Sequence, residues 1–152
     1  AMAFAAKVGA SSSRPILVTP ATLTVTAEEH AGGLIVLDRA SGVTVTLPAA
    51  SGTGNCYYFF IKTGVTSNAN IIKVANSSDV IQGLVQVAQD GGDTTVTFEA
   101  ASTADTVTMN GTTTGGLRGD YLEFEDAGTN LWRVNGRLAA TGTEATPFSA
   151  SV

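Results

Sequence analysis

Val43-Thr44-Val45-Thr46-Leu47-Pro48-Ala49-Ala50 is the stretch of sequence that decides the fold class of this chain. Its first five residues alternate apolar and hydroxylated side chains. Because successive side chains of a β-strand point to opposite faces of the sheet, one face of this segment is apolar and the other carries threonine. Pro48 has no backbone N–H for a neighbouring strand, and it keeps Leu47 extended. We therefore predict a strand that turns its valines toward a core and ends before Pro48.

Similar segments recur along the chain at short intervals. Residues 22–26 alternate in the same way, and residues 34–38 form a continuous apolar run that we expect to pair with residues 43–47 as a hairpin. Valine, threonine and 17 glycines favour strands joined by turns. No segment of 11 or more residues carries a helical apolar stripe. The sequence thus predicts an all-β fold of about ten short strands, arranged as a compact β-sandwich or barrel.

Length and charge exclude several classes of protein. The chain has 152 residues, the size of one domain, and it is 43% hydrophobic and 14% charged, so it is not a disordered polar chain. The net charge is -5 and the eight Lys and Arg residues are scattered, which argues against nucleic acid as a partner. No apolar run approaches the roughly 18 residues that span a bilayer, so we expect no membrane partner.

The two ends of the chain differ from its middle. Residues 1–20 show no strand or helix period and are interpreted as an extended N-terminal arm, followed by a β domain over residues 21–152. Pro15 and Pro20 bracket Ile16-Leu17-Val18. These apolar residues are expected to pack on a neighbouring subunit or another protein. The alternative is a flexible chain end.

A search for catalytic or cofactor chemistry gives a negative prediction. His30 follows two glutamates and is interpreted as a solvated turn residue. Glu123 and Glu125 share a strand face, which a solvated surface explains as well as a pair of catalytic carboxylates. The lone Cys56 is expected to be a small buried apolar residue. We predict no catalytic residues, no cofactor and no metal site, and hence no enzyme.

Four aromatic residues leave two interpretations open. Trp132 lies between apolar residues on a predicted strand and is expected to anchor the core, with its indole N–H needing one partner. The other three are Tyr57, Tyr58 and Tyr121. If two or more of the four rings are exposed and clustered, they would suit sugar stacking.

The order of these segments resembles a pattern found in virion proteins of tailed phages, both capsid decoration proteins and tail fibres. The pattern comprises residues 43–50, Gly54 with the aromatic strand 57–61, and residues 71–75, 79–83, 119–124 and 128–134. The resemblance implies a β-rich subunit that assembles as a homotrimer on the outside of a virion.

Size and repeats distinguish the members of this class. The chain is compact and lacks the coiled-coil or triple-helical repeats of a fibre shaft. This favours a capsid decoration, or cement, protein on the outer capsid surface, where it binds the major capsid protein and stabilises the shell. Candidate shell or subunit contacts are Ile16, Leu17 and Val18 in the arm and Phe148 in the C-terminal tail. The alternative is a receptor- or carbohydrate-binding module of a tail fibre.

Overall fold

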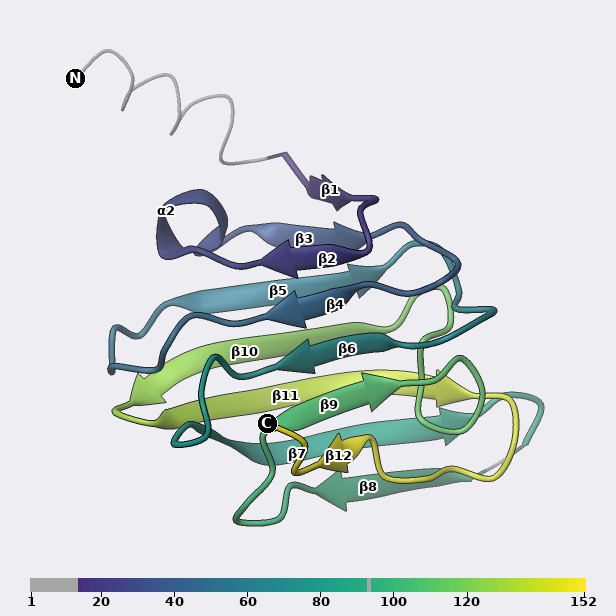
Figure 1. Ribbon diagram of the computed structural model, residues 1–152. Helices are drawn as coiled ribbons and strands as arrows, with labels where there is room; N and C mark the ends of the chain where they lie inside the picture. Colours follow the sequence, from purple (N-terminus) through teal and green to yellow (C-terminus); the bar gives the residue numbers. More distant parts are fainter. Residues whose placement is uncertain (1–13, 93) are drawn as a thin grey trace.

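The computed structural model describes residues 14–92 and 94–152, and these form a β-sandwich (Figure 1). The seven-stranded sheet has, in spatial order, β1 (Ile16–Val18), β3 (Leu34–Leu37), β5 (Cys56–Ile61), β10 (Tyr121–Gly128), β11 (Leu131–Ala140), β7 (Val80–Gln89) and β8 (Thr95–Glu99). The five-stranded sheet has β12 (Phe148–Ser149), β9 (Thr106–Met109), β6 (Asn70–Lys73), β4 (Thr44–Thr46) and β2 (Thr22–Thr24). One helical turn, α2 (Ala27–His30), separates β2 from β3. The predicted all-β sandwich is confirmed.

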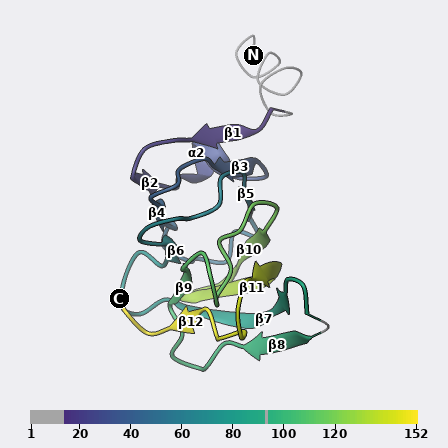
Figure 2. The same cartoon turned by 90° about the vertical axis from the view of Figure 1, so that its right-hand side faces the viewer.

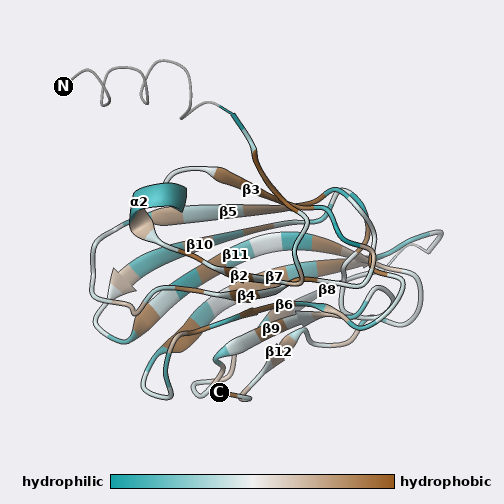
Figure 3. Ribbon diagram, turned by 45° about the horizontal axis from the view of Figure 1, so that its top comes forward, coloured by the Kyte–Doolittle hydropathy of each residue, from teal (hydrophilic) through white to brown (hydrophobic). Residues whose placement is uncertain are grey.

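The core lies between the two sheets, which face each other in the edge-on view of Figure 2. Along β4, Val45 is fully buried while Thr44 and Thr46 are half-buried on the other side, as the alternation predicted. The flanking Val43 and Leu47 are buried too. The same alternation of apolar and polar residues is visible along the longer strands in Figure 3.

The first six strands wind back and forth between the sheets. β1, β3 and β5 are parallel neighbours in one sheet, and β2, β4 and β6 are parallel neighbours in the other. Parallel neighbours cannot be joined by a tight hairpin, and each connection here passes through a strand of the opposite sheet instead of a crossover helix. This winding makes both sheets mixed.

The hairpin predicted between residues 34–38 and 43–47 is wrong. β3 and β4 belong to different sheets, so residues 38–43 carry the chain across the edge of the sandwich. Gly42 has a φ of 82° here, and a Cβ atom on it would lie 2.0 Å from the carbonyl oxygen of Ala69. Only glycine fits this crossing. The amide of Val43 then donates to Asn70 Oδ1 at 2.8 Å, which fixes the start of β4.

The described part of the predicted arm is built into the sandwich. β1 pairs in parallel with β3, matching Ile16 with Ile35 and Val18 with Leu37. The predicted boundary at residue 20 therefore falls between β1 and β2, and residues 16–18 of the predicted arm form the edge strand of the seven-stranded sheet. Residues 1–13 of the predicted arm lie outside the described residues.

Candidate functional site

The outer face of the seven-stranded sheet is the face turned away from the five-stranded sheet. It carries four of the six exposed large apolar side chains of the described residues, namely Leu17, Leu84, Tyr121 and Leu131. Strand alternation divides β5 between the two faces: Tyr57 and Phe59 point into the core, whereas Tyr58 and Phe60 point outward. β10 continues this pattern, since Tyr121 pairs with Phe60 and Leu122 with Phe59. Tyr121 thus joins the outward-facing rings.

Tyr58 and Tyr121 form a stacked pair on this face. Their ring centroids are 6.4 Å apart and their planes lie within 16° of parallel. They are diagonal neighbours on adjacent antiparallel strands, a spacing that lets large rings touch. Burial raises the pKa of the Tyr121 phenol, and the carboxylate of Glu123 acts in the same direction. At neutral pH its phenol O–H is therefore a hydrogen-bond donor.

The stacked pair belongs to an apolar surface that reaches the edge of the sheet. We name this surface the aromatic half, and its outward-facing members are Leu17, Leu34, Tyr58, Phe60 and Tyr121, with Val36 buried beneath them at 7% exposure. Leu17 on the edge strand is 56% exposed and Tyr121 is 36% exposed. Scattered apolar residues are normal on a surface, but a contiguous group of this kind marks an interaction site.

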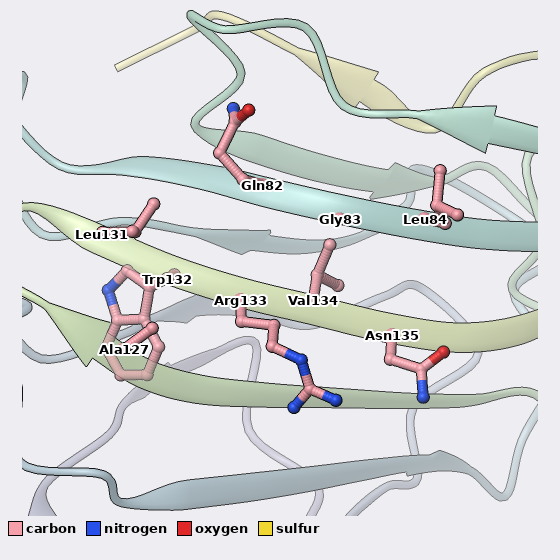
Figure 4. A pocket seen from close by; sticks show the side chains of 9 residues that line it. All are labelled: Gln82, Gly83, Leu84, Ala127, Leu131, Trp132, Arg133, Val134 and Asn135. Atoms are coloured by element: carbon pink, nitrogen blue, oxygen red, sulfur yellow. The ribbon is translucent and has the colours of Figure 1, made fainter.

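A hollow of about 570 Å³ lies on the same face beyond β10, over β7 and β11 (Figure 4). Gly83 is one of its lining residues, and here β7 has a φ of 137° and a Cβ atom would lie 2.2 Å from the Val134 carbonyl oxygen. Leu84, 52% exposed, and Leu131 stand at its sides. We call this feature the leucine hollow. The sequence predicted a bend at Gly83, and β7 instead continues past it without a register shift against β11.

Charged side chains form a strip where the two apolar regions meet, and one of them, Arg133, also lines the leucine hollow. Glu123 and Glu125 project from β10, and Arg133 and Arg137 project from the adjacent β11. Arg133 Nη1 lies 3.3 Å from Glu125 Oε1, an exposed ion pair of small energetic value. Within residues 14–92 and 94–152, neither Glu123 nor Arg137 has an ion-pair partner. The strip is therefore acidic on one strand and basic on the next.

The candidate contact residues predicted from the sequence separate into exposed and buried ones. Leu17 is exposed and lies in the aromatic half, and Ile16 is half-buried against the core. Val18 is 3% exposed and Phe148 is 9% exposed, and both belong to the core of their own chain. Both side chains are thus covered by their own chain, and their contact with a shell or neighbouring subunit stays a prediction. Val18 faces inward beside Leu37, and Phe148 is held by the pairing of β12 with β9.

The four aromatic residues divide between the two faces of the seven-stranded sheet: Trp132 and Tyr57 face the core, and the other two face outward. Trp132 is buried as predicted and packs edge-on against Tyr57, with centroids 5.7 Å apart. Its indole N–H has no acceptor among the described residues. Tyr58, which is half-buried, and Tyr121, which is exposed, lie together on the outer face. The sequence named both but could not bring them together, because β5 and β10 are distant in the chain.

His30 and Cys56, which the sequence analysis weighed for catalysis, are each held by contacts within their own chain. His30 is buried, and its Nδ1 accepts a hydrogen bond from the Thr26 amide at 3.0 Å, so the predicted solvated histidine is wrong. Cys56 is half-buried on the outer face beside Glu125, not in the core. Burial raises the pKa of the Cys56 thiol, with Glu125 adding to the effect, and a protonated thiol is a poor nucleophile.

The part of the chain that the structure describes has neither a metal-binding cluster of side chains nor a helix that could span a membrane. Residues 14–92 and 94–152 contain no group of three or more His, Cys, Asp or Glu side chains placed to hold a metal ion. No helix in the same ranges has the length and apolarity needed to cross a membrane.

Comparisons with protein-family models, curated proteins and solved structures gave no match for this chain.

Proposed function

We propose that this chain is a capsid decoration, or cement, protein of a tailed phage, which binds the outer shell as a homotrimer and stabilises it. The observation that supports the proposal is the aromatic half of the outer face. It presents aromatic and aliphatic side chains together, the composition typical of the centre of a protein–protein interface. We assign the chain no catalytic role.

The proposed mechanism is mass action. A protein that binds an assembled shell, and binds its separated subunits less well, lowers the free energy of the assembled state by an amount that grows with occupancy. Such a protein needs a rigid body and exposed contact surfaces. The sandwich is the rigid body, because its core extends from β1 to β12. The outer face is the exposed contact surface.

The proposal is tested by the position of the chain in an imaged virion. Density for the sandwich on the outside of the shell, in groups of three, is the expected result. Density confined to the tail would overturn the proposal. A second readout is the survival of the shell in chelator or heat after this chain is removed, which we expect to decrease and to recover when the chain is added back.

The second candidate function is carbohydrate binding in a tail fibre, and the Tyr58–Tyr121 pair favours it. Sugars stack on accessible aromatic faces, and this pair is at least partly open to solvent. Glu123 on the same face offers a carboxylate for sugar hydroxyls. Titration with host surface glycans would decide: saturable binding that is lost in Tyr121→Ala supports this function, and absence of binding removes it.

A further inference from the structure

The outer face consists of two unlike apolar regions that meet at a charged strip. In the order β1-β3-β5-β10-β11-β7-β8, the aromatic half covers β1 to β10 and the leucine hollow covers β11 and β7. One region therefore projects large side chains, and the other is a hollow that Gly83 helps to line. A surface made of a projection and a hollow is complementary to a second copy of itself when unlike regions meet.

The charges of the strip are also complementary between two copies of the chain when unlike regions meet. Glu123 belongs to the β10 side and Arg137 to the β11 side, and in the described residues neither has an ion-pair partner of its own chain. A contact between like regions would set Glu123 against a second Glu123. A contact between unlike regions sets Glu123 of one copy against Arg137 of the next.

We propose that the outer face is the contact between copies of this chain, with the aromatic half of one protomer packed on the leucine hollow of the next. Tyr121 and Phe60 of one protomer lie against Leu84 and Leu131 of its neighbour, and Glu123 pairs with Arg137 across the contact. In the homotrimer this contact is heterologous, because each protomer places its two regions against two different neighbours, and heterologous contacts close into a ring when the rotation between copies closes. This inference rests on the proposed function for the homotrimer and adds the surface that builds it.

Charge reversal tests the contact with the full chain. Glu123→Lys faces Arg137 of a neighbour, and Arg137→Glu faces Glu123, so each single variant is expected to raise the half-dissociation concentration about tenfold or more. The double variant restores opposite charges at every contact and is expected to return to the wild-type mass. Lys73→Glu, on the outer face of the five-stranded sheet, is the matched control and should leave the mass unchanged.

Mixing the two single variants distinguishes a contact between chains from one within a chain. The lysine introduced at position 123 of one variant then meets the glutamate introduced at position 137 of the other. The mixture should therefore form larger species than either variant alone in sedimentation velocity. Pairing within a chain cannot be rescued by mixing. Near-UV circular dichroism of the buried Trp132 reports whether each variant is folded.

Three outcomes would overturn the inference. The first is single variants that retain the wild-type mass, the second is a mixture no larger than its components, and the third is a wild-type chain that stays monomeric. Each leaves the shell location to be decided by virion imaging. Conversely, a virion that lacks the chain on its shell would remove the proposed function while mixing still tests the contact.

Discussion

The ring of Tyr58 stacks on the ring of Tyr121 on the outer face, while the next residue back, Tyr57, packs edge-on against Trp132 in the core. Two consecutive tyrosines thus serve opposite sides of one sheet. The inner pair holds the sandwich together, and the outer pair is available to a partner. This division predicts that mutations of the two tyrosine pairs have separate effects on folding and on assembly.

Tyr57→Ala is expected to lower the free energy of unfolding by about 3–5 kcal/mol, because it leaves a cavity beside Trp132. Tyr121→Ala removes only the stacked contact on the surface, worth about 1 kcal/mol, and should weaken assembly. Urea unfolding at one protein concentration and sedimentation equilibrium measure the two effects. Equal losses of stability in the two variants would contradict the division.

Gly83→Ala is expected to destabilise the fold by more than about 2 kcal/mol, because its Cβ would meet the Val134 carbonyl oxygen at 2.2 Å in a backbone conformation that favours glycine. Gly54→Ala is the matched control. Gly54 also has a positive φ, 74°, but no atom lies within 4 Å of the position that a Cβ would take, so about 1 kcal/mol is expected. Thermal unfolding of both variants measures the difference. A control that costs as much as Gly83→Ala would show that close approach is not the cause.

Asp126→Ala is expected to loosen residues 51–53. The Asp126 carboxylate accepts hydrogen bonds from the amides of Ser51, Gly52 and Thr53 and from the Thr53 hydroxyl. Its removal leaves these donors without their acceptor, at a cost of about 1–3 kcal/mol. Hydrogen exchange of the three amides should accelerate. Asp90→Ala, at an exposed turn, is the control and should change neither stability nor exchange.

Asp120 is expected to make stability depend on pH. Burial raises the pKa of this carboxyl to about 6, although the amides of Gly116, Leu117 and Ala139 act in the opposite direction. The folded state then binds the proton more tightly than the unfolded chain, whose pKa is 3.8. The contribution is complete below pH 3.8 and is lost as pH rises through about 6, a change of at most about 3 kcal/mol.

The opposite dependence comes from Asp126. Burial raises the pKa of its carboxyl, but the hydrogen bonds from Gly52 and Thr53 outweigh burial and lower it. Its contribution is present above pH 3.8 and is lost as pH falls through the lower folded pKa. Urea unfolding from pH 3 to 8 should therefore give maximal stability close to pH 3.8, because the Asp126 contribution is lost below that pH and the Asp120 contribution is lost above it. Asp120→Asn should flatten the decline between pH 4 and 7, and an unchanged slope in that variant would contradict the assignment.

The sequence predicted local strand geometry better than strand partners. Alternation in residues 43–47 correctly placed Val45 in the core, because side-chain direction depends only on the strand itself. The pairing of β3 with β4 failed, because residues 38–43 are typical of an ordinary turn while Gly42 is required by contact with Ala69, far along the chain. Pairing across sheets depends on such distant contacts, which a local pattern does not contain.

The candidate site, too, depends on contacts between distant segments that a local sequence pattern does not contain. Tyr58 and Tyr121 were both named from the sequence, but their stacking follows from the β5–β10 register. The leucine hollow was missed, since Leu84 and Leu131 line the same hollow only through the parallel pairing of β7 with β11. Gly83 was the one available signal. The prediction for His30 was wrong because its buried bond to Thr26 depends on the single turn α2.

The mass of the full chain in solution tests the account most directly. Sedimentation equilibrium across a range of concentrations, with light scattering as a second method, should give a species of three chains, against 15.4 kDa for one chain. That mass should decrease toward one chain in Glu123→Lys and recover in the double variant with Arg137→Glu. A single species of 15.4 kDa at every concentration would contradict the account.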